Sequence, residues 1–211
     1  MVMKIIVCIL IGYLIGTLNP AYFISKMKGF DIRKKGSGNA GASNALIVLG
    51  KAAGVMCAVF DMAKTCVAIG LAEYLFPGFE YAFTLSGVAC ILGHIFPFYM
   101  KFKGGKGLAC IGGMILKFDR KIFFIMLAIE VILVLIVDYI FVVPLSASII
   151  FPVVYAIVTK VILGSAILLI GTGAIFYRHR ENILRLQAGT EARFSLLWNK
   201  DEEIKRISKG E

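Results

Sequence analysis

Hydrophobic residues occur along this chain in long runs, and polar residues gather in short segments between the runs. Residues 1–25 carry one charged side chain, Lys4, and residues 122–159 carry only Glu130 and Asp138. A helix that crosses a bilayer needs about 20 mostly apolar residues. The pattern therefore predicts an all-α, polytopic integral membrane protein, and it lacks the strict alternation typical of a membrane β-barrel.

The first half of the chain contains three runs of spanning length. The first is interpreted as a retained span, because the polar edge and small-residue cleavage site of a secretory signal are weak. We expect these spans near residues 3–25, 52–75 and 81–100.

The second half is less regular. Residues 107–117 are too short and too glycine-rich for a comfortable full crossing. Residues 122–177 form one long apolar stretch, interrupted by Asp138 and two prolines. This stretch can hold two long spans or three short ones near residues 122–137, 139–157 and 161–177.

The basic residues restrict the topology. The polar segments at 26–51, 101–106 and 178–211 all hold lysine or arginine clusters, so the positive-inside rule places all three on the cytoplasmic face. An even number of crossings must then follow residue 106. Seven spans result if 107–117 crosses the membrane, and five result if it is re-entrant.

The amino-acid composition argues against several functional classes. The chain has 211 residues, of which 59% are hydrophobic and 17% charged, and its formal net charge is +10. We do not expect a nucleic-acid partner, because the lysines and arginines flank spans and no soluble surface remains for a basic groove. The five cysteines lie in or beside apolar segments, with no metal-binding spacing.

The first polar loop, residues 31–44 (DIRKKGSGNAGASN), has the composition of an anion-binding loop. Glycines allow backbone N–H groups to converge on one point, and serine and asparagine side chains add donors. Ser43 or Asn44 could also cap the following helix. The spacing G-x-G-x-x-G occurs here without a surrounding βαβ pattern, which excludes a dinucleotide fold. The candidate binding residues in this loop are Gly36, Ser37, Gly38, Asn39, Ser43 and Asn44.

The second polar loop, residues 101–107 (KFKGGKG), resembles half of a phosphate-binding loop. It combines lysines as point charges with three glycines, but the full G-x-x-x-x-G-K-[ST] pattern of nucleotide hydrolases is missing. Its candidate residues are Lys103, Gly104, Gly105, Lys106 and Gly107.

The third polar segment, residues 178–191 (RHRENILRLQAGTE), begins where the last apolar run ends. If the helix continues, His179 and Asn182 share a face with Arg178 close by. An imidazole beside an amide can orient a hydroxyl, accept its proton or stabilise an oxyanion. The other histidine, His94, lies in an apolar run and is interpreted as a packing or hydrogen-bonding residue.

Together, these three segments predict an anionic, phosphorylated ligand at a membrane surface, where an acyl chain can reach it from the bilayer. Lipid-headgroup chemistry fits this description. A phosphate transporter is an alternative, although no internal repeat is visible in the sequence.

The motifs GSGNAGASN, FKGGKGLA and HRENILRLQAGTE resemble the three signature motifs of the bacterial acyl-phosphate:glycerol-3-phosphate acyltransferase (PlsY) family, over about residues 10–191. The resemblance implies a seven-helix enzyme of the bacterial inner membrane, with its active site facing the cytoplasm. It also implies transfer of an acyl group from acyl phosphate to the sn-1 hydroxyl of glycerol 3-phosphate. No metal, coenzyme or obligate protein partner is implied, and 192–211 is left as a charged cytoplasmic tail.

Residue roles carried over from the resemblance fall on all three segments. Ser37, Lys106, His179 and Asn182 are implied to be catalytic. The glycines of the second loop match those associated with glycerol 3-phosphate binding, and Asn44 and Glu191 match further motif positions.

This chain departs from the family pattern at three positions. Ile47 stands where the family has arginine, Cys110 where threonine is usual, and Thr65 where glycine is usual. Loss of a charge-assisted hydrogen bond costs roughly 1.5–3 kcal/mol. A catalytically weakened paralogue that binds phospholipid or an acyltransferase is therefore an alternative hypothesis.

Overall fold

The computed structural model describes residues 1–197, and residues 198–211, most of the expected tail, lie outside the described part. The described residues form nine α-helices and three short 3₁₀ helices, which confirms the all-α fold class. The 3₁₀ helices are η1 (Ile32–Lys34), η2 (Phe98–Met100) and η3 (Phe194–Leu197). The α-helices are α1 (Val2–Thr17), α2 (Pro20–Met27), α3 (Ala42–Leu49), α4 (Lys51–Leu75), α5 (Ala82–Ile95), α6 (Leu108–Phe118), α7 (Arg120–Val137), α8 (Val142–Thr159) and α9 (Ile162–Gln187).

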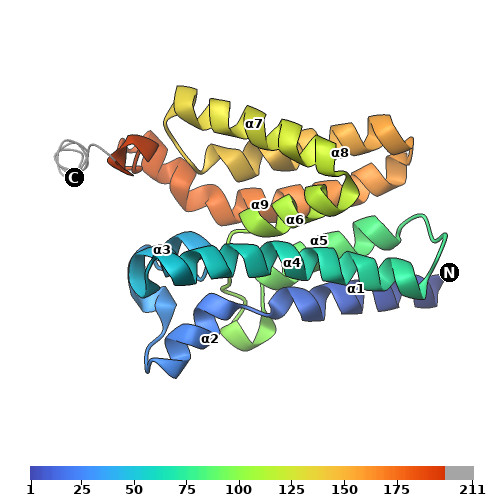
Figure 1. Cartoon of the computed structure of the whole chain (residues 1–211), viewed down its shortest axis with the longest axis horizontal. Coiled ribbons are helices and arrows are strands. Elements are labelled where there is room, and N and C mark those ends of the chain that lie inside the picture. The colour runs from blue at the N-terminus through green and yellow to red at the C-terminus, as the bar shows by residue number, and fades with distance from the viewer. Residues whose placement is uncertain (198–211) are drawn as a thin grey trace.

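Helices α1, α4, α5, α6, α7, α8 and α9 lie alongside one another, and each runs opposite to the one before it (Figure 1). Among the described residues, five segments are long and apolar enough to cross a membrane, which confirms the membrane-spanning class. These segments are Val2–Met27, Lys51–Leu75, Ala82–Met100, Val142–Thr159 and Ile162–Gln187. The short-span interpretation of residues 122–177 corresponds to α7, α8 and the first part of α9, and α9 continues ten residues beyond the expected end.

Helix α6 explains the ambiguity around residues 107–117. Its 11 residues rise about 16 Å, roughly half of the ~30 Å hydrocarbon core. Its last turn nevertheless lies at the far end of α4, because Lys117 forms an ion pair with Glu73 at 2.9 Å. The second loop enters the bundle before α6 begins, since the N–H of Gly104 donates to the Ile95 carbonyl. Loop and short helix together cover the distance that one spanning helix would cover.

The first expected span, 3–25, corresponds to the segment Val2–Met27, and its helix is interrupted between α1 and α2. Leu18 is extended, and Pro20 begins α2. Asn19 caps α2 by accepting the N–H of Tyr22 at 2.9 Å, and its Nδ2 donates to the Ala40 carbonyl at 2.8 Å. Proline lacks an N–H and disfavours helical geometry at the preceding residue, which accounts for the break.

Small residues bring α1 and α5 into close contact. Gly12 and Gly16 form a G-x-x-x-G pair on α1, and a Cβ added at either would overlap the carbonyl oxygen of Ser86 or Cys90 on α5. In a membrane, helices associate through such close backbone approach rather than through hydrophobic burial. The contact holds the end of α5, and the second loop that follows it, against the α1–α2 break.

Candidate active site

The three polar segments meet at one end of the bundle, which we call the polar end and define by residues 28–44, 101–107 and 178–197 (Figure 1). From the first loop, Arg33 donates to the Met100 carbonyl beside the second loop. From α9, Arg178 donates to the Gly105 carbonyl at 3.2 Å and the Gly104 carbonyl at 3.0 Å. The second loop therefore lies between the other two segments.

Asn44 shapes the first loop from inside. Its Nδ2 group donates to the carbonyls of Ile32, Lys35 and Asn39 at 3.1, 3.0 and 2.8 Å. Its Oδ1 accepts the backbone N–H of Ser37 at 2.8 Å. The side chain is fully buried, so its amide is used to hold the loop in shape.

Two glycines make this loop conformation possible. Gly36 and Gly38 have φ values of +58° and +72°, which L side chains rarely adopt. A Cβ at Gly36 would also overlap Oδ1 of Asn44. Ser37 is exposed between the two glycines. Oδ1 of Asn39 is buried and, within residues 1–197, has no hydrogen-bond partner, so a ligand hydroxyl could satisfy it.

The cap of α3 differs from the expectation that Ser43 or Asn44 provides it. Gly41 is the N-cap and there is no side-chain cap, because α3 begins at Ala42 and Asn44 turns back into the loop. Ser43 is exposed in the first turn, one turn before Ile47, whose side chain is 66% exposed.

The glycines of the second loop allow close packing on α5. The N–H groups of Gly104 and Gly105 donate to the carbonyls of Ile95 (2.9 Å) and His94 (3.1 Å), so these two donors are committed to the end of α5. Gly107, with φ of +88°, is the N-cap of α6. Lys103 is exposed at the mouth of the loop.

Lys106 begins a chain of short hydrogen bonds into the third segment. Its Nζ donates to Oδ1 of Asn182 at 2.5 Å, and Nδ2 of Asn182 donates to Oε1 of Glu191 at 2.5 Å. Arg185 pairs with Oε2 of Glu191 at 2.6 Å. Burial, followed by the positive charge of Arg185, lowers the pKa of Lys106 below its usual value of 10.5. The chain fixes the orientation of the Asn182 amide.

His179 lies one turn before Asn182 on the buried face of α9. Its Nδ1 is 2.8 Å from the Ile175 carbonyl. A carbonyl only accepts, so Nδ1 carries the proton and a neutral ring presents Nε2 as an acceptor. The charged groups acting on the ring are Lys106, Arg178 and Glu191.

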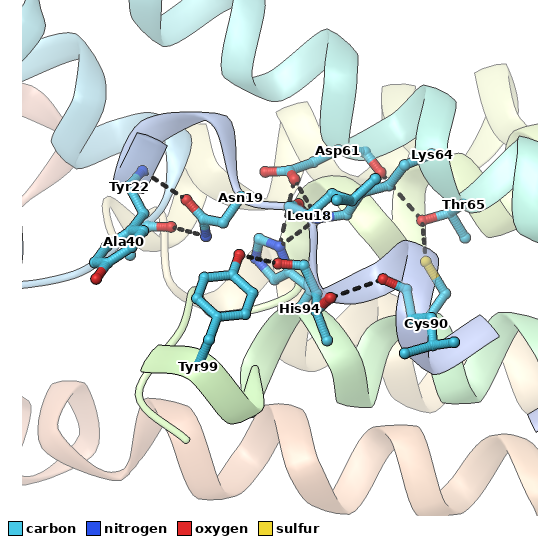
Figure 2. A network of polar contacts seen from close by, with 12 residues as sticks. Leu18, Asn19, Tyr22, Ala40, Asp61, Lys64, Thr65, Cys90, His94 and Tyr99 are labelled. Atoms are coloured by element: carbon cyan, nitrogen blue, oxygen red, sulfur yellow. Dashed lines mark hydrogen bonds and ion pairs between the residues drawn. The ribbon is translucent and has the colours of Figure 1, made fainter. Parts of the chain in front are cut away.

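A second polar cluster lies deeper, beneath the second loop (Figure 2). Asp61 and Lys64 of α4 form an ion pair at 2.6 Å, and Lys64 Nζ lies 3.0 Å from Nδ1 of His94. In the described part of the chain, Asp61, His94 and Cys110 are the group whose donor atoms, all within 4.8 Å of one another, could hold a metal ion. The Lys64 ammonium already lies within bonding distance of two of these donors. A metal would have to displace it.

Residues 6–189 match the family model described as Glycerol-3-phosphate acyltransferase. The chain belongs to the glycerol-3-phosphate acyltransferase family. It is similar to the glycerol-3-phosphate acyltransferase of Lactiplantibacillus plantarum, with 37% identity over 210 residues, covering 97% of this chain and all of the relative. The same enzyme of Coxiella burnetii (strain RSA 493) is 38% identical over 196 residues, covering 92% of this chain and all of the relative.

Two crystal structures of PlsY (YgiH), an integral membrane glycerol 3-phosphate acyltransferase, are similar to this fold. The glycerol 3-phosphate form has a TM-score of 0.80 and 32% identity, and the lysophosphatidic acid form has 0.78 and 31%. Each similarity covers 92% of this chain and 96% of the other. The resemblance to the PlsY family inferred from the motifs is thereby confirmed, and the transporter alternative receives no support.

Two of the departures from the acyltransferase pattern lie together, away from the first loop. Thr65 is buried on α4, 3.4 Å from Sγ of Cys90 on α5. Cys110 is buried beside His94 and Asp61. Both substitutions therefore change the surroundings of the deeper cluster, and neither removes a charge from the polar end.

Asp61 and Lys64 lie outside the three sequence motifs of this acyltransferase. Both lie within an otherwise apolar span and are buried. Ionisable residues inside a membrane span are costly and usually functional, and their spacing of three places them on one helix face. That signal is present in the sequence of α4.

Proposed function

We propose that this chain transfers an acyl group from acyl phosphate to the sn-1 hydroxyl of glycerol 3-phosphate, releasing lysophosphatidic acid and phosphate. The family is established, whereas the donor and the roles of individual residues are proposals. These proposals rest on the hydrogen-bonded chain Lys106–Asn182–Glu191, which joins the second loop to the third segment. The first loop, whose composition is that of an anion-binding loop, lies beside them.

The reaction needs positioning more than covalent chemistry. Acyl phosphate is a mixed anhydride with a good leaving group, so no enzyme nucleophile is required. The sn-1 oxygen forms a bond to the acyl carbon, and the bond from that carbon to the phosphate oxygen breaks. The proton of the hydroxyl ends on the released phosphate, directly or through His179. Lys106 offsets the negative charge that develops on the carbonyl oxygen.

Holding two phosphates together requires several positive charges. Lys103, Lys106 and Arg178 border the second loop, and the first loop adds Lys34 and Lys35. Ser37 and Ser43 are exposed hydroxyls, and the buried Oδ1 of Asn39 has no hydrogen-bond partner in the described part of the chain. These groups support a site with one phosphate near each loop. The acyl chain of the donor would lie between helices in the bilayer.

We infer that the protein resides in the bacterial cytoplasmic membrane with the polar end facing the cytoplasm. Within residues 1–197, the polar end carries 11 of the 19 lysines and arginines, as the positive-inside rule favours for cytoplasmic segments. Its substrates are the membrane-embedded acyl phosphate and the soluble glycerol 3-phosphate, and neither a coenzyme nor a protein partner enters the proposed reaction.

The exposed side chain of Ile47 favours a second candidate, a catalytically weakened member of the family. An arginine there would lie one turn from Ser43 at the edge of the first loop. Without it, the site has fewer charges for two phosphates.

Purified protein in proteoliposomes tests the proposal. Glycerol 3-phosphate is supplied with either a long-chain acyl phosphate or the matching acyl-CoA, and lysophosphatidic acid is quantified by mass spectrometry. We expect product with acyl phosphate alone, and unchanged rates in the control Lys121→Ala, which lies at the opposite end of the bundle. Product from acyl-CoA alone would overturn the proposed donor, and no product from either would favour the weakened member.

A further inference from the structure

The deeper cluster surrounds one buried ammonium group with three oxygen and nitrogen atoms. Lys64 Nζ lies 2.7 Å from the Leu18 carbonyl, 2.6 Å from Oδ1 of Asp61 and 3.0 Å from Nδ1 of His94 (Figure 2). The contacts with Leu18 and His94 are hydrogen bonds, whereas the contact with Asp61 is an ion pair, and within residues 1–197 Oδ1 of Asp61 has no hydrogen-bond partner. An ammonium has donors and no acceptor. Nδ1 of His94 accepts from Lys64.

The cluster joins separate parts of the fold. Leu18 is the extended residue that breaks α1 from α2, Asp61 and Lys64 belong to α4, and His94 belongs to the last turn of α5. Burying an ion pair within a membrane protein carries a desolvation cost of several kcal/mol per ion. A cluster with this cost needs a function that an apolar contact would not supply. Its position below the second loop indicates what that function is.

The imidazole of His94 lies directly against the second loop. A Cβ added at Gly105 would overlap Nε2 of His94 and lie 2.7 Å from its Cε1. The N–H of Gly105 also donates to the His94 carbonyl at 3.1 Å. From the other side, Arg178 holds the Gly105 carbonyl at 3.2 Å. The peptide that precedes Lys106 is therefore held between the His94 ring and the Arg178 guanidinium.

We propose that His94 is a positioning residue for acyl transfer. Asp61 and Lys64 orient its ring, and the ring supports Gly105 so that Lys106 reaches Asn182 and the substrate. This inference rests on the proposed function. Only glycine at position 105 allows the peptide to lie on the ring, and only a fixed ring defines where the peptide lies.

A double-mutant cycle between His94 and Gly105 tests the contact. Gly105→Ala should raise the KM for glycerol 3-phosphate at least tenfold in the wild-type background, because the added methyl group displaces the loop. In the His94→Ala background, the same change should cost less than threefold, because the overlapping ring is absent. If the KM increase of the double variant equals the product of the increases in the two single variants, the proposal is overturned.

His94→Asn separates positioning from structural support. Asparagine keeps an acceptor near the place of Nδ1 for Lys64 but removes the ring beneath Gly105. We expect a KM for glycerol 3-phosphate raised about tenfold with a thermal unfolding midpoint close to that of the wild type. A wild-type KM would overturn the proposal, whether or not the midpoint falls.

The same cycle measured by thermal unfolding in detergent does not depend on catalysis. If the wild type produces no lysophosphatidic acid, the proposed function fails, and the unfolding midpoints of the two single variants and the double variant still decide whether ring and loop are coupled. Non-additive midpoints support the contact between His94 and Gly105, and additive midpoints overturn it.

Discussion

The ammonium of Lys106 lies 2.5 Å from Oδ1 of Asn182, although the two residues are 76 positions apart in the sequence. The contact joins a glycine loop between two helices to the last helix of the bundle. Because Asn182 is held in turn by Glu191, a change at any of the three residues alters the position of the other two.

Lys106 should determine the alkaline limb of activity. Burial lowers its pKa below 10.5, and the proposed reaction needs the charged form. Activity should therefore fall as the pH rises through this lowered pKa. In Lys106→Arg, which stays charged, the limb should move to higher pH even though the altered geometry lowers the maximal rate. Rate profiles against pH, corrected for spontaneous hydrolysis of acyl phosphate, measure this; identical alkaline limbs in both proteins would contradict it.

Asn44 should be required because it holds the first loop in shape. Asn44→Ala removes four buried contacts that share three hydrogens, two on Nδ2 and one on the Ser37 amide, each hydrogen bond being worth about 1 kcal/mol. We expect kcat/KM to fall at least about 100-fold. Asn44→Asp is the matched variant, since it keeps the acceptor for Ser37 but turns a carboxylate toward three carbonyls. It should be as impaired as Asn44→Ala, and a nearly active Asn44→Asp would show that the three donated bonds are dispensable.

Ile47→Arg should raise activity. A guanidinium at this exposed position can form a charge-assisted hydrogen bond to a substrate phosphate, worth roughly 1.5–3 kcal/mol, or about ten- to a hundredfold in kcat/KM. Ile47→Gln, of similar length without the charge, serves as the control and should leave the rate near that of the wild type. Equal rates for all three proteins would mean that position 47 does not face a phosphate.

Asp138 should help to hold Glu191 in place. It caps α7, and its carboxylate accepts the N–H and the hydroxyl of Ser195, both at 2.8 Å. Ser195 lies four positions after Glu191, so loss of this contact frees the segment that orients Asn182. We expect Asp138→Ala to lower kcat several-fold, consistent with about 1 kcal/mol.

Asp138→Asn is the conservative comparison. Asparagine tolerates the left-handed backbone at φ of +65° and keeps an acceptor, so it should retain most of the activity. If Asp138→Ala has the same kcat as the wild type, the contact between Asp138 and Ser195 does not contribute to catalysis.

Hydropathy and charge were sufficient to predict much of this molecule. Each expected span from 52 onward corresponds to a helix, and the three polar segments meet at one end as their shared basic character indicated. These features are local, since a span depends on its own length and composition. The G-x-x-x-G pair on α1 is also local, although its partner on α5 is not.

Other features depend on partners that are distant in the sequence. The break at Leu18 leaves a carbonyl that Lys64 satisfies from another helix. Asn44 belongs to a recognisable motif, yet its inward orientation follows from carbonyls of the folded loop. His94 was correctly interpreted as a hydrogen-bonding residue, but its place beneath Gly105 requires the second loop to enter the bundle. Such contacts are made only when the helices pack.

The most direct test of the proposed site is the rate at which His179→Ala forms lysophosphatidic acid from acyl phosphate and glycerol 3-phosphate in proteoliposomes. Wild type and the Lys121→Ala control are measured beside it, with folding checked by the thermal unfolding midpoint. The proposed site predicts a folded protein whose rate falls to the spontaneous background. A folded His179→Ala that forms product at the wild-type rate would contradict it.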